Sequence, residues 1–454
     1  MRQRGLSYSY FKNTPYWDGS FKRTTYPAAM NRADFLAGTA SAALLGANAG
    51  AALPRRVRFG ANYVPSRTWW YLWSDWDPDG VRRDLHDVAA LGMDHIRIQL
   101  LWPEFQPNAA AVSAQNLSRL LQLLDMAHEV RLDVEVTVLD GQLSGFLFVP
   151  PYLIDNRDGR VRNFIVDAEL VQAQVRLFDA IAREVAAHPR FLGFDIANEI
   201  YWFTQPLHVA FSPAQGDAWM QRLLSHCERV APGKMHVNGV DKWPYEAAKP
   251  QGFTRRALAR AGAASVVHPW AGFGPIFPRY GPLSTAATHY AEFLVQYMQA
   301  FSAGGRRPMW IEEDGCSKVW MREELIPHWA QASIRNAASC DHLFGITWWC
   351  SHDVNPHLRG FNRLEYDLGL YTNDRQLKPL GRAISDLIDE FDRTPPQPLR
   401  RERALVIPDD EGSDALLARY VRSVDEGVRP QIVLASRTND LPYLRERGIS
   451  ELIR

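Results

Sequence analysis

Cysteine is scarce in this chain, and neither sign of charge is in excess. Only four of the 454 residues are cysteine, and none of them forms a C-x-x-C pair. This argues against a disulfide scaffold and a structural zinc site, and we expect buried free thiols with at most one disulfide. Lysine plus arginine and aspartate plus glutamate both total 51. The resulting net charge of zero argues against a protein that binds nucleic acid by neutralising phosphates.

The chain also lacks a long, strongly apolar run. Its longest uncharged stretch, residues 35–53, is rich in alanine and glycine and is too weakly apolar to predict a membrane helix. A short basic segment with Arg32 precedes it and small residues lie near Ala49, which is typical of an export signal. We therefore expect translation to start at Met30, and a mature protein in the periplasm or the medium without a membrane anchor. The alternatives are an N-terminal helix packed on the domain and a cytoplasmic protein.

No nucleotide-binding loop of the form G-x-G-x-x-G or G-x-x-x-x-G-K-[ST] occurs where it is needed, which excludes the usual phosphate cradles. From residue 56 on, short β-branched runs alternate with longer helical patterns, and most runs are almost continuously apolar, as in strands covered on both faces. This predicts an α/β fold, a (β/α)8 TIM barrel, rather than a doubly wound open sheet. The predicted strands are Val57–Tyr63, His95–Leu101, Asp133–Leu139, Phe191–Ile196, Met235–Val240, Ser265–His268, Met309–Glu313 and Phe344–Trp349.

The composition changes again near residue 394, where a proline-rich segment begins. Beyond it, two short strand patterns alternate with two helical patterns, which predicts a small C-terminal α/β appendage. It is too small to hold much core alone and should dock on the barrel. We expect an N-terminal extension with the export signal (1–53), a catalytic barrel (54–393), and a linker with the C-terminal module (394–454). The module could also serve as a homodimer contact.

Active residues of such a barrel lie at the C-terminal ends of its strands, and acidic residues occupy two of these ends. Glu199 follows the fourth predicted strand and Glu313 ends the seventh. Paired carboxylates suit glycoside hydrolysis, in which one protonates the leaving oxygen and the other attacks the anomeric carbon or activates water. The 15 tryptophans fit a protein that stacks sugars. Further candidates near strand ends are Arg97, Asn198, His268, Trp270, Trp349, His352 and Asp353.

These residues, in this order, resemble the signature of glycoside hydrolase family 5, in clan A of retaining (β/α)8 hydrolases. The resemblance covers roughly residues 56–392 and rests on Arg97, Asn198-Glu199, His268, Glu313-x-Gly315 and Trp349. Other segments are similar to the bacterial subgroup that contains exo-β-mannosidases. They are Asn62-Tyr63-x-Pro65-Ser66, Leu101-Trp102-Pro103-x-Phe105-Gln106-Pro107, His268-Pro269-Trp270-Ala271, the segment 347–353, Glu365-Tyr366-Asp367-Leu368-Gly369-Leu370 and the C-terminal module.

The resemblance implies a retaining exo-β-mannosidase that acts on β-linked oligosaccharides or glycosides without a cofactor or a metal. It implies Glu313 as the nucleophile, kept ionised by Arg97, and Glu199 as the acid/base. It further implies that the sugar is bound by Arg97, Asn198, His268, Trp270, Trp349, Trp102, Tyr63, His352 and Asp353. Trp348 is the rival of Trp349 as sugar platform, because the phase of the last strand is open. Adjacent strand residues point to opposite faces, so Glu312 should face the barrel wall or a helix.

Two departures from the family pattern concern the sugar site. Trp270 stands where the family often has a tyrosine, and an indole is not expected to replace the phenolic donor to the nucleophile. Gln142 stands where the third strand often ends in histidine. The alternatives to an exo-β-mannosidase are an endo-β-1,4-mannanase or a β-glucanase with the same chemistry and, more remotely, a non-catalytic carbohydrate-binding barrel.

Overall fold

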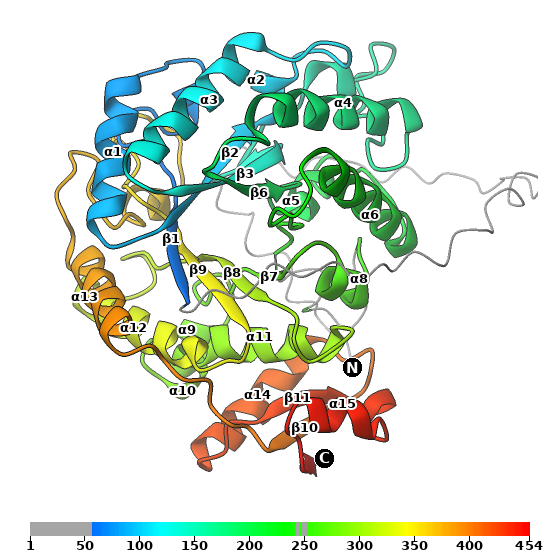
Figure 1. The fold of residues 1–454 in the computed structure, drawn as a ribbon, viewed down its shortest axis with the longest axis vertical. Helices are drawn as coiled ribbons and strands as arrows, with labels where there is room; N and C mark the ends of the chain where they lie inside the picture. Colours follow the sequence, from blue (N-terminus) through cyan, green and yellow to red (C-terminus); the bar gives the residue numbers. More distant parts are fainter. Residues whose placement is uncertain (1–56, 242–245, 247–251) are drawn as a thin grey trace, which may run out of the picture. The chain divides into compact units, whose positions relative to one another are not determined.

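The computed structural model describes residues 57–241, 246 and 252–454, so the export signal expected in residues 1–53 lies outside the described part. Parallel strands form a seven-stranded sheet in the order β6-β3-β2-β1-β9-β8-β7, with helices around it (Figure 1). The strands are β1 (Arg58–Asn62), β2 (His95–Leu101), β3 (Asp133–Asp140), β6 (Phe191–Asp195), β7 (Ser265–Val267), β8 (Met309–Asp314) and β9 (Leu343–Trp348).

The fifth predicted strand, Met235–Val240, is reduced to one bridge between Val237 and Asp195. The Val237 N–H donates to the carbonyl of Phe194 at 2.8 Å, so the segment still runs parallel to β6. Gly239 then adopts a φ of 55°, which ends the extended backbone because this conformation favours glycine. The barrel is therefore completed by a short segment rather than by a regular eighth strand.

The outer layer consists of amphipathic helices whose apolar faces pack on the strands. Local signals start several of them. Asp167 caps the helix Ala168–Val185 (α4) by accepting from two backbone N–H groups, and Ser212 and Gln215 form a capping box at the helix Pro213–Val230 (α6). The long helices of the barrel are α1 (Pro78–Ala90), α3 (Ala114–Glu129), α4 (Ala168–Val185), α6 (Pro213–Val230), α11 (Tyr290–Phe301), α12 (Ile326–Ala338) and α13 (Pro379–Arg393).

Short elements between the strands and helices build the rim of the barrel. The helical ones are η2 (Trp69–Trp73), α2 (Trp102–Phe105), η3 (Pro151–Leu153), α5 (Ile200–Thr204), α8 (Arg255–Arg260), α9 (Ile276–Tyr280), α10 (Thr285–Thr288), η4 (Glu323–Leu325) and η5 (Arg363–Tyr366). A two-stranded hairpin, β4 (Gln142–Leu143) with β5 (Phe146–Leu147), follows β3.

The C-terminal module is a parallel three-stranded sheet in the order β11-β10-β12 that lies beside α11 (Figure 1). Its elements are β10 (Arg403–Ile407), α14 (Ser413–Asp425), β11 (Gln431–Leu434), η6 (Ala435–Arg437), α15 (Leu441–Glu446) and β12 (Glu451–Ile453). The sequence analysis missed β12, a three-residue strand that begins with a charged residue. Buried Glu292 of α11 accepts hydrogen bonds from Arg401 (2.7 Å), Arg429 (2.8 Å) and the Tyr420 hydroxyl (3.0 Å). This ionic cluster fastens the module to the barrel.

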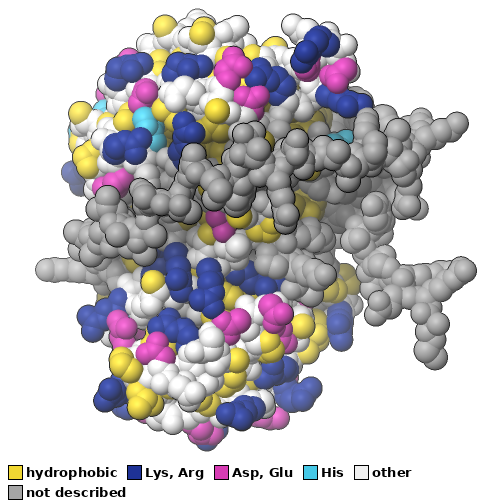
Figure 2. Space-filling view, turned by 90° about the vertical axis from the view of Figure 1, so that its right-hand side faces the viewer, with side chains coloured by type: hydrophobic (Ala, Val, Ile, Leu, Met, Phe, Trp, Pro, Cys, Tyr) yellow, Lys and Arg dark blue, Asp and Glu magenta, His cyan; other side chains and the backbone are white. Residues whose placement is uncertain are grey.

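Three general features agree with the composition. All four cysteines are free and buried. Basic and acidic side chains are mixed on the face seen in Figure 2. Within the described ranges, no helix combines the length and the apolar character needed to cross a membrane.

Candidate active site

Four charged side chains from different strands meet at the C-terminal end of the barrel. Arg97 comes from β2 and Glu313 from β8, whereas His268 directly follows β7. Glu199 lies between β6 and α5, where its backbone has a φ of 38° and its N–H donates to the carbonyl of Gly239 at 2.9 Å. This left-handed turn directs the Glu199 side chain towards His268, whose ring it contacts.

Arg97 is the buried centre of the cluster. Its guanidinium donates to Glu313 Oε1 at 2.5 Å, to Asp195 Oδ2 at 2.7 Å and to Asn198 Oδ1 at 2.9 Å. A fourth bond, at 3.1 Å, goes to Asn62. Because the planar guanidinium binds all of these groups at once, it fixes the Glu313 carboxylate and the Asn198 amide relative to each other.

Glu313 is almost completely buried, and burial raises its pKa above the ordinary range. His268 and Arg97 oppose this shift by favouring the carboxylate, whereas the charge of Glu199 adds to it. Arg97 thus acts in the expected direction but does not outweigh burial. Glu313 is therefore held in a low-dielectric site, where any positive charge near it favours its carboxylate form.

His268 lies between carboxylates on both sides of its ring. Nδ1 contacts Glu199 Oε1 and Nε2 contacts Glu312 Oε2, each at 2.9 Å. Burial opposes the charged ring, but Glu313, Glu199 and Glu312 together raise the pKa of His268 well above its usual value. His268 is therefore an imidazolium that donates from both nitrogens and holds Glu199 in place.

Glu312 does not face the barrel wall or a helix as expected. It is fully buried inside the barrel, where it binds His268 and lies 3.5 Å from the Arg97 Nε. The pairing of β8 with β9 shifts register between Ile311 and Asp314, which breaks the strict alternation of side chains along the strand. Both neighbouring glutamates therefore reach His268.

One oxygen each of Glu199 and Glu313 and one nitrogen of His268 all lie within 4.8 Å of one another. Ligand atoms at this spacing could hold a cation, and a second such group is Asp84, Asp87 and His352. In the first group, protonated His268 and Arg97 already supply the positive charge. The arrangement therefore matches two carboxylates on either side of a reacting bond.

Trp270 contacts Glu313 directly. Its indole N–H donates to Glu313 Oε2 at 3.1 Å, so the indole does supply a donor at this position, contrary to the sequence-based expectation. Gln142 contributes its backbone, because the Asn198 amide donates to the Gln142 carbonyl at 3.1 Å. Neither departure leaves the two carboxylates without hydrogen-bonding support.

The two tryptophans at the end of β9 lie in different environments. Trp349 packs edge-on against Trp69, with ring centroids 5.9 Å apart, and lies 6.3 Å from Trp270. Trp348 belongs to the main core and packs against Trp329. The phase of the strand therefore favours Trp349 over Trp348 as the residue beside the carboxylates.

No protein-family model and no curated protein matches the chain, but solved structures do. A GH5_18 protein from Streptomyces cattleya, crystallised with Manβ1-4GlcNAc, is similar with a TM-score of 0.84 and 36% identity, over 87% of this chain and 98% of its own. A GH5_18 protein from Bifidobacterium longum subsp. infantis has a TM-score of 0.82 and 30% identity, over 88% of this chain and 96% of its own. The chain belongs to glycoside hydrolase family 5.

This membership confirms the family and the barrel that the sequence analysis expected. The protein is a glycoside hydrolase that acts on β-linked sugars. An exo-β-1,4-mannosidase from Opitutaceae bacterium strain TAV5 shares the fold at a TM-score of 0.69 and 22% identity, over 83% of this chain and 69% of its own.

Two of the expected sugar ligands of this family 5 site are structural residues. Trp102 is fully buried, donates from its indole to Gln106 and packs against Phe164. Tyr63 is also fully buried, and its hydroxyl donates to Asp84 at 3.1 Å. Their aromatic rings belong to the main core, so the motifs that contain them support the barrel rather than the sugar.

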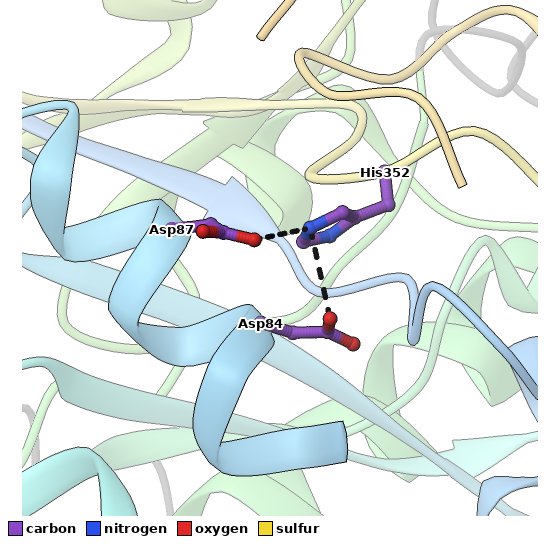
Figure 3. A group of neighbouring side chains, drawn as sticks. All are labelled: Asp84, Asp87 and His352. Carbon is purple, nitrogen blue, oxygen red and sulfur yellow. Dashed lines mark hydrogen bonds and ion pairs between the residues drawn. The ribbon is translucent and has the colours of Figure 1, made fainter. Parts of the chain in front are cut away.

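His352 and Asp353 each have charged partners outside the carboxylate cluster. His352 lies beside Asp84 and Asp87 of α1 (Figure 3), with its Nε2 3.3 Å from Asp87 Oδ2. Arg375 also donates to Asp87, which gives this cluster its own cation. Asp353 accepts from the Lys378 ammonium at 2.7 Å. Both residues thus fasten the loop after β9.

The sequence analysis missed three acidic residues of the site. Asp195 accepts from Arg97 and from the Thr137 hydroxyl, and burial raises its pKa to about 6. Asp241 follows the fifth barrel segment and accepts from the Trp202 indole at 2.7 Å. Glu365 lies in η5. Asp195 and Asp241 could have been found from their positions at or after the ends of strands. Glu365 belongs to a segment that resembles the exo-β-mannosidase subgroup, but the sequence analysis gave it no role.

An aromatic wall borders the site next to Trp349. Its members come from η2, from the hairpin β4–β5 and from the loop before η5, and their ring centroids lie 4.3–6.4 Å apart along a chain of contacts. They are Trp69, Trp70, Phe146, Phe148 and Phe361. We call this group the aromatic wall.

Proposed function

We propose that this family 5 enzyme is a retaining exo-β-mannosidase that cleaves Manβ1-4GlcNAc and related short β-mannosides. The observation that carries the mechanism is the distance of at most 4.8 Å between one oxygen of Glu199 and one of Glu313. Retaining enzymes place their carboxyl groups about 5–5.5 Å apart, and inverting enzymes need about 6.5–9.5 Å to admit a water. Two GH5_18 relatives bound to Manβ1-4GlcNAc support the choice of substrate.

In the first step, the Glu313 carboxylate attacks the anomeric carbon while the bond to the leaving oxygen breaks. Glu199 gives its proton to that oxygen, and a glycosyl ester on Glu313 forms. Arg97 and Trp270 hold both oxygens of Glu313 in position for this attack. Asn198 keeps one amide hydrogen beyond its bond to Gln142, and this hydrogen would bind the sugar 2-hydroxyl.

In the second step, Glu199 takes a proton from a water that attacks the same carbon, and Glu313 leaves as a carboxylate. The glycosyl ester is thereby hydrolysed with net retention. His268 contacts Glu199 through Nδ1 and Glu312 through Nε2, so we assign it the role of positioning Glu199 in both steps. Trp349 would form the platform for the sugar.

Exo action is supported by the aromatic wall. It packs against Trp349 through Trp69, and a packed aromatic wall beside the sugar platform would stop a longer chain from extending past it. An endo enzyme would need an open cleft at this place. The wall therefore favours removal of a single terminal sugar.

The test uses Manβ1-4GlcNAc, with proton NMR to follow the anomer that appears first. We expect β-mannose first, and no product from Glu313→Gln. On β-1,4-mannohexaose, mannose and mannopentaose should be the only early products. Early release of α-mannose would overturn retention, and early release of mannobiose, mannotriose or mannotetraose would point to an endo enzyme. A parent enzyme that cleaves an aryl β-glucoside but no β-mannoside would contradict the proposed substrate.

A further inference from the structure

Glu365 is a buried carboxyl group that the mechanism above does not use. It lies in η5, and only 8% of the residue is exposed. Its Oε2 accepts from the Ser144 hydroxyl at 2.9 Å, and the Ser144 oxygen accepts in turn from the Trp69 indole at 3.2 Å. These bonds join η5, the hairpin β4–β5 and η2 at the aromatic wall.

The position of Glu365 relative to the two catalytic candidates is informative. The charge of Glu313 adds to the burial that raises the pKa of Glu365, whereas the charge of Glu199 adds to the burial that raises the pKa of another unused acid, Asp241. Since Glu199 faces the leaving group, Asp241 belongs to that side of the site. Glu365 is linked to Trp69 through Ser144, and Trp69 packs on Trp349, so Glu365 belongs to the side where the terminal sugar would lie against Trp349 and the aromatic wall.

The Glu365 carboxyl group is buried with few hydrogen-bond partners, which costs folding free energy. Ser144 is its only hydrogen-bond partner among the described residues, although a carboxylate has about four acceptor positions. Burial raises the pKa of Glu365 to about 7, an effect that Ser144 opposes and Glu313 increases. A buried acid with unfilled acceptor positions in a site that binds polyols is suited to hydroxyl donors.

We propose that Glu365 binds hydroxyl groups of the terminal mannose on the side of the ring away from the scissile bond. It would thereby recognise the free end of the chain, because a mannose inside a β-1,4 chain lacks the 4-hydroxyl donor. The inference rests on the proposed mannosidase function. It assigns a specificity-determining role to a residue that neither attacks nor protonates the substrate.

The test measures kcat/KM on p-nitrophenyl β-mannoside and on its 4-deoxy analogue, for the parent and for Glu365→Ala. Hydrogen bonds to a charged group correspond to roughly a 10- to 100-fold change, and we expect a loss of this size when either the carboxyl or the hydroxyl is removed. Removing both the carboxyl and the 4-hydroxyl should lower kcat/KM little more than removing one of them, as expected for two groups in contact. Ser144→Ala, which keeps the carboxyl, should lose less activity than Glu365→Ala.

Tyr366→Phe is the matched control. It removes the hydroxyl of the next residue in η5, which donates to the Leu358 carbonyl at 2.8 Å. We expect this variant to keep the kcat/KM of the parent, and its melting temperature to change about as much as that of Glu365→Ala. The inference would be overturned if the losses in kcat/KM from removing the carboxyl and the 4-hydroxyl were strictly additive, or if Glu365→Ala were as active as the parent. Either result would leave the mannosidase proposal standing. A parent that cleaves no β-mannoside would overturn both.

Discussion

The indole N–H of Trp270 donates to Glu313 Oε2 at 3.1 Å, while Arg97 holds the other oxygen at 2.5 Å. A tryptophan thus gives the proposed nucleophile its second donor. Both donors favour the carboxylate over the protonated acid, and they oppose the burial that raises the pKa of Glu313.

Trp270→Phe should therefore weaken the enzyme by removing this donor while keeping an aromatic ring. We expect kcat/KM on p-nitrophenyl β-mannoside to fall roughly 10- to 100-fold, as for a hydrogen bond to a charged group. The acidic limb of the pH profile should move to higher pH, because the carboxylate loses a stabilising contact. Trp320→Phe is the control, since Trp320 packs on Trp270 without a described contact to Glu313. An unmoved acidic limb would contradict this account.

Asp241 should act as a neutral group. Burial, and then the charge of Glu199, raises the pKa of Asp241 well above its ordinary value. Asp241→Asn keeps a neutral side chain of the same shape, so we expect kcat/KM and its basic limb to stay close to those of the parent. A clear downward shift of the basic limb in this variant would mean that the native carboxyl is ionised beside Glu199.

Glu365→Gln should stabilise the protein at alkaline pH. The folded chain holds the Glu365 proton up to a pKa of about 7, above the value of about 4.3 in an unfolded chain. The folded state therefore loses stability as the pH rises through this window, by up to about 4 kcal/mol. Glutamine removes that cost, so the melting temperature of the variant should exceed that of the parent at pH 8, with the gain disappearing near pH 4. The same gain at both pH values would refute the explanation, and exposed Glu426→Gln serves as control.

Glu292→Gln should loosen the C-terminal module. Although burial disfavours the carboxylate, His289, Arg429 and Arg401 lower the pKa of Glu292 to about 2. Breaking a buried ionic cluster on one side costs about 3–5 kcal/mol, which thermal unfolding at pH 7 would detect. The stabilisation of the parent should fade as the pH drops from about 4.3 towards 2. Glu451→Gln, which breaks a solvent-exposed pair with Arg403, should cost much less.

The sequence predicted the barrel well because parallel strands covered on both faces leave a strong pattern of apolar runs. It predicted a regular strand at Met235–Val240, whereas Gly239 ends the extended backbone there after a single bridge. It missed β12 because a three-residue edge strand carries almost no periodic signal. Patterns of two residues per repeat need more than three residues to be recognised.

The central site was predictable because its members stand at strand ends in a fixed order. The side-chain directions were not. The direction of the Glu312 side chain depended on a shift of register between β8 and β9. The choice between Trp348 and Trp349 depended on which of the two faces the site at the end of β9. Burial of His352 and of Tyr63 depended on their partners Asp87 and Asp84 on α1, which lie 265 residues before His352 and 21 residues after Tyr63.

Because Trp349 makes edge-on contacts with Trp69 and Trp270, tryptophan fluorescence should report sugar binding at the site. Indole emission responds to the polarity and the rigidity of its surroundings, and a sugar on Trp349 would change the surroundings of this ring and of the two rings packed on it. Binding to a Glu313→Gln variant could then be titrated by intrinsic fluorescence, without a chromogenic aglycone. Natural oligosaccharides that carry no dye would become measurable ligands.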